Sequence, residues 1–202
     1  MLIRVNDLDT HFTLCGEGEP VILLHGWGTS AESLGGIAKA LEDQFRVFAI
    51  DLPGFGWTTP PPAAWGTREY AAHVEAFMGS SGIPTANLLG HSFGGRIALA
   101  LAAQSPHRVR RLVLVASAGI RANLRPRYYL KIGAAKLAKL VFSFPLWGRL
   151  GERILSMVHR RVGSRDYRNA GQMRRTLVRV VNEDLRDILS SVQAPKIGRA
   201  HV

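Results

Sequence analysis

The chain has 202 residues, of which 47% are hydrophobic and 20% are charged, with a single cysteine and a formal net charge of +11. This composition is typical of a globular domain with a core of its own, and it excludes a disulfide framework, a multi-cysteine metal site and a disordered chain. No apolar run approaches the ~20 residues of a bilayer-spanning helix. The N-terminus also lacks a secretory signal pattern, so we expect a cytoplasmic protein.

Strand and helix patterns alternate through residues 1–119. Val21–Leu24 is a continuous apolar run, as expected of a strand buried on both faces of a parallel sheet. The expected strands are 2–5, 10–14, 21–24, 46–50, 88–89 and 112–115, and the expected helices are 30–41 (capped by Ser30), 67–78 and 96–104. The alternation predicts an α/β fold with a doubly wound, mostly parallel sheet.

The pattern and the charge both change after Gly119. Residues 1–119 hold 8 basic and 10 acidic side chains, whereas residues 120–181 hold 15 basic and 2 acidic ones. Only helical periodicity follows, as far as about residue 190. We therefore expect 1–119 to be the N-terminal part of the core, 120–190 a helical lid insertion, and 191–196 the start of the remaining core.

One motif in the sequence indicates a catalytic site. Gly90–Gly94 fits the pattern G-x-S-x-G, with Ser92 at its centre, an apolar strand before it and a helix after it. This strand–turn–helix setting is what a nucleophile elbow requires, because the tight turn lifts the serine hydroxyl above the sheet. The alternative is a glycine-rich turn that only joins the two elements. The setting favours catalysis.

At these residues the chain resembles the α/β-hydrolase superfamily, and most closely its lidded serine esterases and carbon–carbon bond hydrolases. The resemblance covers residues 1–119. It rests on His25–Gly28 after the first long apolar strand, Asp51–Gly56 after the next, and Gly90–Gly95 at the elbow. Related dehalogenases and epoxide hydrolases carry an aspartate at the elbow. Because this chain has Ser92 there, we expect it to belong to neither of these two classes of enzyme.

The resemblance implies roles for individual residues. Ser92 would be the nucleophile, and the backbone N–H groups of Trp27 and Phe93 would form the oxyanion hole. Gly90, His91 and Gly94 would shape the elbow. His25 would shape the oxyanion loop instead of acting as the base, and Asp51 would cap its own loop.

A serine nucleophile needs a histidine base that is oriented by a carboxylate. The resemblance implies the order serine, acid, histidine, with the last two beyond the lid. We expect the triad acid and histidine to be absent from this chain, with no strand after Pro195. Residues 197–202 match the in-frame translation of a common sequencing-library adapter, so we expect these six residues to be an artefact and the 202-residue chain to be inactive or nearly so.

The basic segment 120–181 allows three interpretations. The first is a solvated lid whose aromatic side chains face the sheet or the substrate. The second is a lid that touches an anionic membrane weakly, through an amphipathic helix near 131–144. The third, nucleic-acid binding, lacks any recognised module, and we expect no nucleic-acid partner.

The expected function is that of a serine hydrolase that cleaves an ester-like bond through an acyl-enzyme on Ser92. Lid aromatics such as Phe142, Phe144 and Trp147 favour a largely apolar small-molecule substrate. No metal and no organic cofactor is expected, because hydroxyl, imidazole and oxyanion donors suffice for this chemistry. The alternatives are cleavage of a carbon–carbon bond in a diketone by the same fold, and a non-catalytic binding protein.

Overall fold

The computed structural model describes residues 1–117, 119, 166 and 169–199. Contacts divide the chain into two compact units, one made of 1–120 with 172–202 and the other of 121–171. Most of the predicted lid lies outside the described residues, whereas 172–190, which the prediction assigned to the lid, groups with the core. No helix in the described ranges is long and apolar enough to cross a bilayer.

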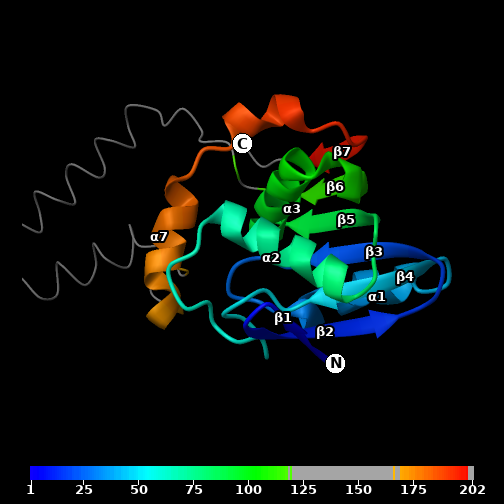
Figure 1. Cartoon of the computed structure of the whole chain (residues 1–202), viewed down its shortest axis with the longest axis horizontal. Coiled ribbons are helices and arrows are strands. Elements are labelled where there is room, and N and C mark those ends of the chain that lie inside the picture. The colour runs from blue at the N-terminus through cyan, green and yellow to red at the C-terminus, as the bar shows by residue number, and fades with distance from the viewer. Residues whose placement is uncertain (118, 120–165, 167–168, 200–202) are drawn as a thin grey trace, which may run out of the picture. The chain divides into compact units, whose positions relative to one another are not determined.

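A seven-stranded sheet forms the centre of this unit, in the order β1-β2-β4-β3-β5-β6-β7 (Figure 1). Strand β1 pairs with β2 and β2 pairs with β4 in antiparallel fashion, and all other pairs are parallel. The strands are β1 Leu2–Val5, β2 Leu8–Cys15, β3 Glu19–Leu24, β4 Phe45–Ile50, β5 Ala86–His91, β6 Val109–Val115 and β7 Lys196–Arg199. The predicted fold class, a mostly parallel α/β sheet, is confirmed.

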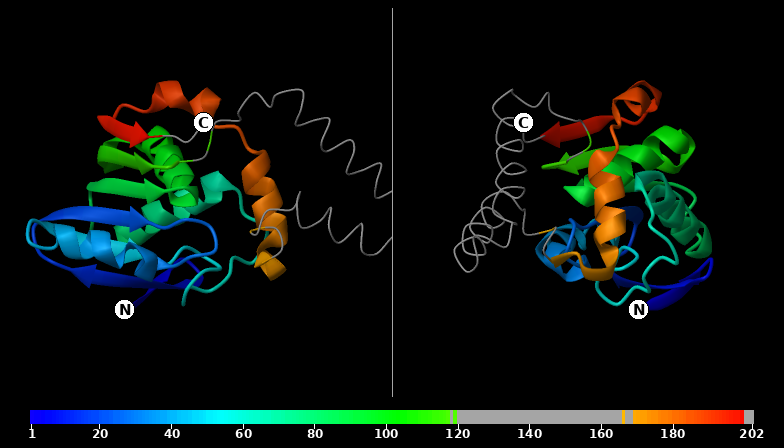
Figure 2. Two further views of the ribbon diagram at one scale, coloured as in Figure 1. Left: turned by 180° about the vertical axis from the view of Figure 1, so that it is seen from behind. Right: turned by 90° about the vertical axis from the view of Figure 1, so that its left-hand side faces the viewer.

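Helices bury both faces of the sheet because the central strands are apolar on both sides. Along β3, Ile22 and Leu24 belong to the larger core under α2 (Thr67–Ser80) and α3 (Phe93–Gln104). The alternate residues Val21 and Leu23 face the smaller core, which holds the 3₁₀ helix η1 (Ala31–Leu34) and α1 (Gly35–Leu41). Figure 2 shows α1 on the face opposite to α2 and α3.

The prediction that no strand follows Pro195 is wrong. Residues Lys196–Arg199 form β7, which lies parallel to β6 with Leu112 opposite Lys196. The amide of Leu112 also donates to the carbonyl of Pro195, at 3.0 Å. The strand has no apolar run, and Ile197 is 78% exposed, so no hydrophobic pattern reveals it. Backbone groups at the open edge of β6 pair with an extended segment whatever its side chains.

The helix that begins after Ser30 is capped differently from the prediction. Ser30 holds the capping position, but its side chain makes no capping hydrogen bond. The carboxylate of Asp51 takes that role and accepts the amide of Ala31 at 2.6 Å. The donor and the acceptor are twenty residues apart, so only the folded chain brings them together.

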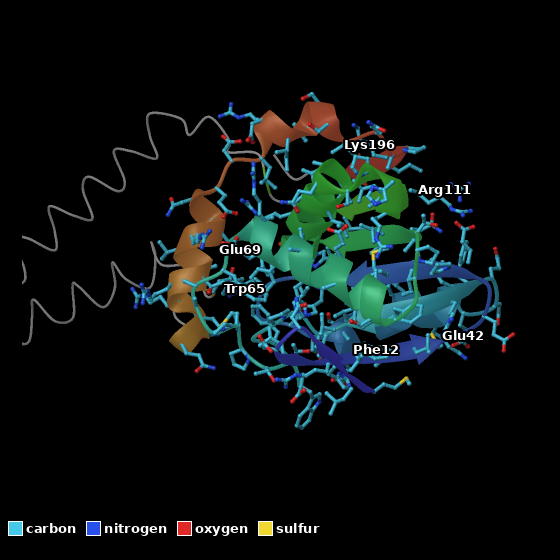
Figure 3. All side chains as sticks on the ribbon, in the orientation of Figure 1. Phe12, Glu42, Trp65, Glu69, Arg111 and Lys196 are labelled. Carbon is cyan, nitrogen blue, oxygen red and sulfur yellow. The ribbon has the colours of Figure 1, made fainter. Side chains whose placement is uncertain are left out.

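After the 121–171 unit the chain returns to the core, and its first α-helix there, α7 (Arg174–Asn182), is bonded to the start of α2. Arg179 donates to the carboxylate of Glu69 and, at 2.8 Å, to the carbonyl of Ala64. Figure 3 shows Glu69 and Trp65 at the end of α2 that faces α7. The apolar residues Leu177 and Val180 are buried on the same helix. This attachment groups 172–190 with the core.

A buried histidine makes the stability of this core depend on pH. His73 of α2 is 1% exposed, its Nε2 lies 3.1 Å from Thr10 Oγ1, and its Nδ1 has no partner among the described residues. Burial lowers the pKa of His73 to about 4 from the ordinary 6.5. Since the unfolded chain then binds the proton more tightly, stability is full above pH 6.5 and is lost as the pH falls below that value.

We therefore expect the free energy of unfolding to fall by about 2 kcal/mol between pH 7 and pH 5 through this residue. The paired change Thr10→Val with His73→Leu removes the titrating ring without leaving the threonine hydroxyl unpaired. Urea unfolding at both pH values is expected to show a smaller loss in this variant than in the wild type. His107→Gln, at an exposed position, is the control and keeps the full loss. Equal losses in all three proteins would exclude His73 as the cause.

Candidate active site

Ser92 lies in the sharp turn between β5 and α3. Its backbone has φ 50° and ψ −106°, a region that residues with a Cβ rarely adopt and that costs about 1–3 kcal/mol. The amide of Ser92 donates to the carbonyl of Val115 at 3.0 Å, and its own carbonyl accepts the amide of Arg96 at 3.3 Å. The side chain is half-buried. The structure thus shows the strained strand–turn–helix geometry that the motif predicts.

The glycines of the motif are required by close contact between backbones. A Cβ at Gly90 would lie 2.5 Å from the carbonyl oxygen of Gly94. A Cβ at Gly94 would overlap the carbonyl of Leu24 in β3. The helix therefore starts in direct contact with the central strand, and this contact holds the turn that carries Ser92.

The loop after β3 lies beside Ser92. A Cβ at Gly26 would lie 3.6 Å from the Cβ of Ser92 and 2.9 Å from His91 Nδ1. The amide of Gly94 donates to the carbonyl of His25 at 3.0 Å. Strand β3 lies between β4 and β5, so the chain order reverses here, and such switch points are where ligands of open α/β sheets bind.

The two predicted oxyanion donors flank this meeting point. Trp27 follows Gly26 in the loop and Phe93 follows Ser92, and their rings meet edge to face with centroids 5.2 Å apart. Within the described residues, neither amide donates a hydrogen bond to another group of the protein. Phe55 packs against both rings. The oxyanion hole at Trp27 and Phe93 stays a prediction, and this arrangement leaves its donors available.

His25 has both ring nitrogens occupied by the backbone. Leu52 donates its amide to Nε2 at 3.0 Å, so the proton is on Nδ1, which donates to the carbonyl of Gly26 at 2.7 Å. The ring is fully buried, and burial lowers its pKa. A neutral imidazole fixed in this way joins the loop after β3 to the loop after β4. It is a structural group and has no free nitrogen with which to act as a base.

We expect His25→Leu to lower the free energy of unfolding by about 2–4 kcal/mol, because it leaves the buried amide of Leu52 without a partner and removes one donor from the carbonyl of Gly26. Urea unfolding followed by circular dichroism measures the loss. His107→Leu, at an exposed position, is the matched control and should stay within about 0.5 kcal/mol of the wild type. A His25→Leu protein as stable as this control would show that the imidazole is not the joint between the two loops.

Both carboxylate oxygens of Asp51 are also engaged in contacts within the protein. Its Oδ1 accepts the amide of Ala31, and its Oδ2 accepts the amide of Trp57 at 3.0 Å and faces His11 Nδ1 at 2.8 Å. The carboxylate is almost fully buried. These contacts agree with the expectation that Asp51 caps its loop, and they add the cap of η1.

A polar cleft of about 460 Å³ opens beside the loop that follows β3. It is lined by Gly28, Thr29, Ser30, Glu32, Ser33 and Gly56. Thr29 Oγ1 donates to the carbonyl of Gly26 at 2.9 Å, and Ser33 Oγ donates to the carbonyl of Ser30 at 2.6 Å. Because these two hydroxyl protons are used within the protein, the hydroxyls of Thr29 and Ser33 and the carboxylate of Glu32 offer mainly hydrogen-bond acceptors to the cleft.

Among the described residues, no histidine or carboxylate is bonded to Ser92. Within the described ranges, the hydroxyl of Ser92 makes no hydrogen bond to a histidine or a carboxylate. His91 packs its ring against Gly26. The absence of a triad acid and histidine from the whole chain stays a prediction, because residues 120–165 lie outside the described residues.

Sequence reasoning missed one group near the elbow. Arg96, one helical turn after Ser92, is 6% exposed and donates from Nη2 to the carbonyl of Glu183 at 2.9 Å. An arginine in an otherwise apolar helix, between Gly95 and Ile97, is the only sign that the sequence offers. Its partner lies 87 positions away.

Comparison with known proteins agrees with this geometry. A family model described as alpha/beta hydrolase fold matches residues 19–142. The chain is 33% identical over 123 residues to 2-hydroxy-6-oxo-2,4-heptadienoate hydrolase of Pseudomonas putida, which covers 59% of this chain and 45% of that protein. It is 39% identical over 109 residues to 2-hydroxymuconate semialdehyde hydrolase of Pseudomonas sp. (strain CF600), with 52% and 38% covered.

The solved enol-lactonase of Burkholderia xenovorans LB400 superposes with a TM-score of 0.70 at 24% identity, over 99% of this chain and 80% of that one. This likeness shows the fold alone. The chain spans less than half the length of the two curated relatives named above. Since the family model covers more than half of the chain, and since the sheet and the elbow have the expected form, the chain belongs to the α/β-hydrolase fold family.

Proposed function

We propose that this chain is the nucleophile-bearing part of a serine hydrolase that cleaves an ester-like bond. The observation that carries the proposal is the strained conformation of Ser92, with φ 50°, next to the loop that contains Gly26. A fold keeps such strain where it places a reacting group. If the protein were instead a non-catalytic binding protein, nothing would require a serine in this conformation.

In this mechanism Ser92 Oγ attacks the carbonyl carbon and passes its proton to a histidine. The negative charge on the carbonyl oxygen is stabilised by the amides of Trp27 and Phe93, and losing one such donor typically costs about 10²–10³-fold in rate. The alcohol leaves with the proton, and water then hydrolyses the acyl-enzyme. We propose that the histidine and its carboxylate lie in the part of the longer gene product that follows residue 196, in keeping with the part of the relatives' length that the chain covers.

A second candidate reaction is hydrolysis of a carbon–carbon bond in a diketone. The names of the two relatives favour it, since both are hydrolases of dienoate or semialdehyde compounds. Both reactions use an acyl-enzyme in our proposal and differ in the leaving group, which is an alcohol in one and a carbanion in the other. The nucleophile is therefore common to both, and substrate turnover decides between them.

The test is labelling with a fluorophosphonate probe. The product of the source gene, sequenced afresh through its stop codon, is expected to be labelled at Ser92, and Ser92→Ala is expected not to be. Turnover of p-nitrophenyl esters and of 2-hydroxy-6-oxo-2,4-heptadienoate then distinguishes the two reactions. An unlabelled Ser92 in a folded gene product would favour the binding protein.

The same sequencing tests the origin of residues 197–202. A stop codon directly after Val202 in clean genomic DNA would refute the adapter explanation. We propose that the 202-residue chain by itself turns over p-nitrophenyl esters at a small fraction of the rate of the longer product. Equal rates would contradict this.

A further inference from the structure

The two connections between the core and the 121–171 unit are joined to each other on the core side. Gly119 lies on the outgoing chain, and Leu185 lies on the returning chain, three residues after the end of α7. The amide of Leu185 donates to the carbonyl of Gly119 at 2.9 Å. Gly119 has φ +147°, and a Cβ there would lie 3.2 Å from Leu185 Cδ1. A glycine thus lets the two connections run in direct contact.

Arg96 of α3 bonds to the returning chain and lies near Gly119 of the outgoing one. Its Nη2 donates to the carbonyl of Glu183 at 2.9 Å on the returning side. Its Cγ would be 3.7 Å from a Cβ at Gly119 on the outgoing side. The side chain begins one helical turn after Ser92, whose carbonyl accepts the Arg96 amide at 3.3 Å. Arg96 therefore bonds to the elbow through its backbone amide and to the returning chain through its side chain, and the Leu185–Gly119 hydrogen bond links the returning chain to the outgoing one.

Arg96 and Glu183 also contact the first residue of α2, Thr67. Arg96 Nε lies 3.5 Å from Thr67 Oγ1, and the Glu183 carboxylate accepts the amide of Thr67 at 2.9 Å. Burial lowers the pKa of the Arg96 guanidinium, and the nearby carboxylates of Glu183 and Asp184 act in the opposite direction. A guanidinium held in the interior by carbonyl and hydroxyl acceptors has few alternative positions, because a buried charge without partners is costly.

We propose that Arg96 is a positioning residue that holds the nucleophile elbow by joining α3 to the returning chain at Glu183, which the Leu185–Gly119 hydrogen bond links to the outgoing chain. This inference rests on the proposed function for its chemical consequence, the reactivity of Ser92. Loss of the guanidinium frees the first turn of α3 and the segment 183–185 from each other. A displacement of about 1 Å at the nucleophile lowers a rate by up to about 100-fold.

The experiment compares Arg96→Met with Arg96→Lys and with Arg108→Met. Arg108 is the matched control, because it also donates to a backbone carbonyl, that of Pro84, at 2.8 Å, yet lies at the far end of α3 from the elbow. Two properties are measured in the folded gene product: the rate of fluorophosphonate labelling at Ser92, and amide hydrogen exchange at residues 92–96 and 183–185.

We expect Arg96→Met to slow labelling about 10- to 100-fold and to speed exchange in both segments. Arg96→Lys is expected to recover part of each effect, because one donor still reaches the Glu183 carbonyl. Arg108→Met should label within about twofold of the wild type. Labelling at the wild-type rate in Arg96→Met, with faster exchange at 183–185 alone, would show a simple structural anchor and would overturn the proposal.

Failure of the proposed function has a different signature. If the wild-type protein is not labelled at Ser92, the serine hydrolase proposal fails, and the exchange measurement still decides whether Arg96 holds the elbow. Faster exchange at both 92–96 and 183–185 in Arg96→Met, with no change in Arg108→Met, supports the positioning role. Unchanged exchange at 92–96 contradicts it.

Discussion

Replacing Ser92 by glycine is expected to abolish acyl transfer and at the same time to relieve strain in the fold. The hydroxyl is the proposed nucleophile, so its loss should lower turnover by about 10⁴-fold or more. The backbone at φ 50° and ψ −106° suits glycine better than serine. Since Ser92→Ala keeps the Cβ and the strain, we expect the glycine variant to be about 1 kcal/mol more stable than the alanine variant.

The pair of variants separates the two roles of this position. Ester turnover and fluorophosphonate labelling in the gene product measure the chemistry, and urea unfolding measures the strain. Both variants should be inactive, and only glycine should gain stability. Turnover at the wild-type rate in either variant would exclude Ser92 as the nucleophile, whereas equal stability of the two would show that the turn stores no strain.

Gly94→Ala is expected to have the largest effect on stability of any single methyl addition at the elbow. The added Cβ would overlap the carbonyl group of Leu24. Leu24 is fully buried and pairs with Ile50 on one side and Gly90 on the other, so β3 has no room to move. We expect a loss of more than about 4 kcal/mol, a large share of the ~5–15 kcal/mol that stabilises a typical domain.

Gly79→Ala is the matched control for this prediction. Gly79 is a helical residue of α2 and is exposed, and a methyl group added there would have no neighbouring atom within 4 Å. Alanine there should raise the free energy of unfolding by about 0.5–1 kcal/mol, because it restricts the unfolded chain and favours the helix. Thermal unfolding of the two variants measures the contrast. A Gly94→Ala protein as stable as Gly79→Ala would show that the helix can move away from β3.

The sheet topology explains why the candidate site forms where it does. The loops after β3, β4 and β5 all leave the carboxyl ends of adjacent parallel strands. His25 joins the first two loops, and the Gly94 amide joins the first to the elbow. Ser92, the proposed nucleophile, is thus held by backbone contacts with the middle strand, which favours precise placement over adaptability.

Most of the core elements were predictable because their signals are local. The buried run Val21–Leu24 and the motif around Ser92 each identify their element within a few residues, and the structure confirms both, with ends that agree or differ by two or three residues. The resemblance to the α/β hydrolases is confirmed by the family model. The structural role of His25, which the resemblance implied, agrees with the two backbone hydrogen bonds of its ring.

By itself, the amino-acid sequence determined the alternation of strands and helices, the family, and the residue that stands at the elbow, since each depends on neighbours along the chain. Only the tertiary structure decided the cap that Asp51 provides, the pairing of Lys196–Arg199 with β6, and the partners of Arg96. These contacts join groups 20 to 87 residues apart. In each of them at least one partner is a backbone carbonyl or amide. Because nearly every residue carries these groups, the sequence does not show which one will be the partner.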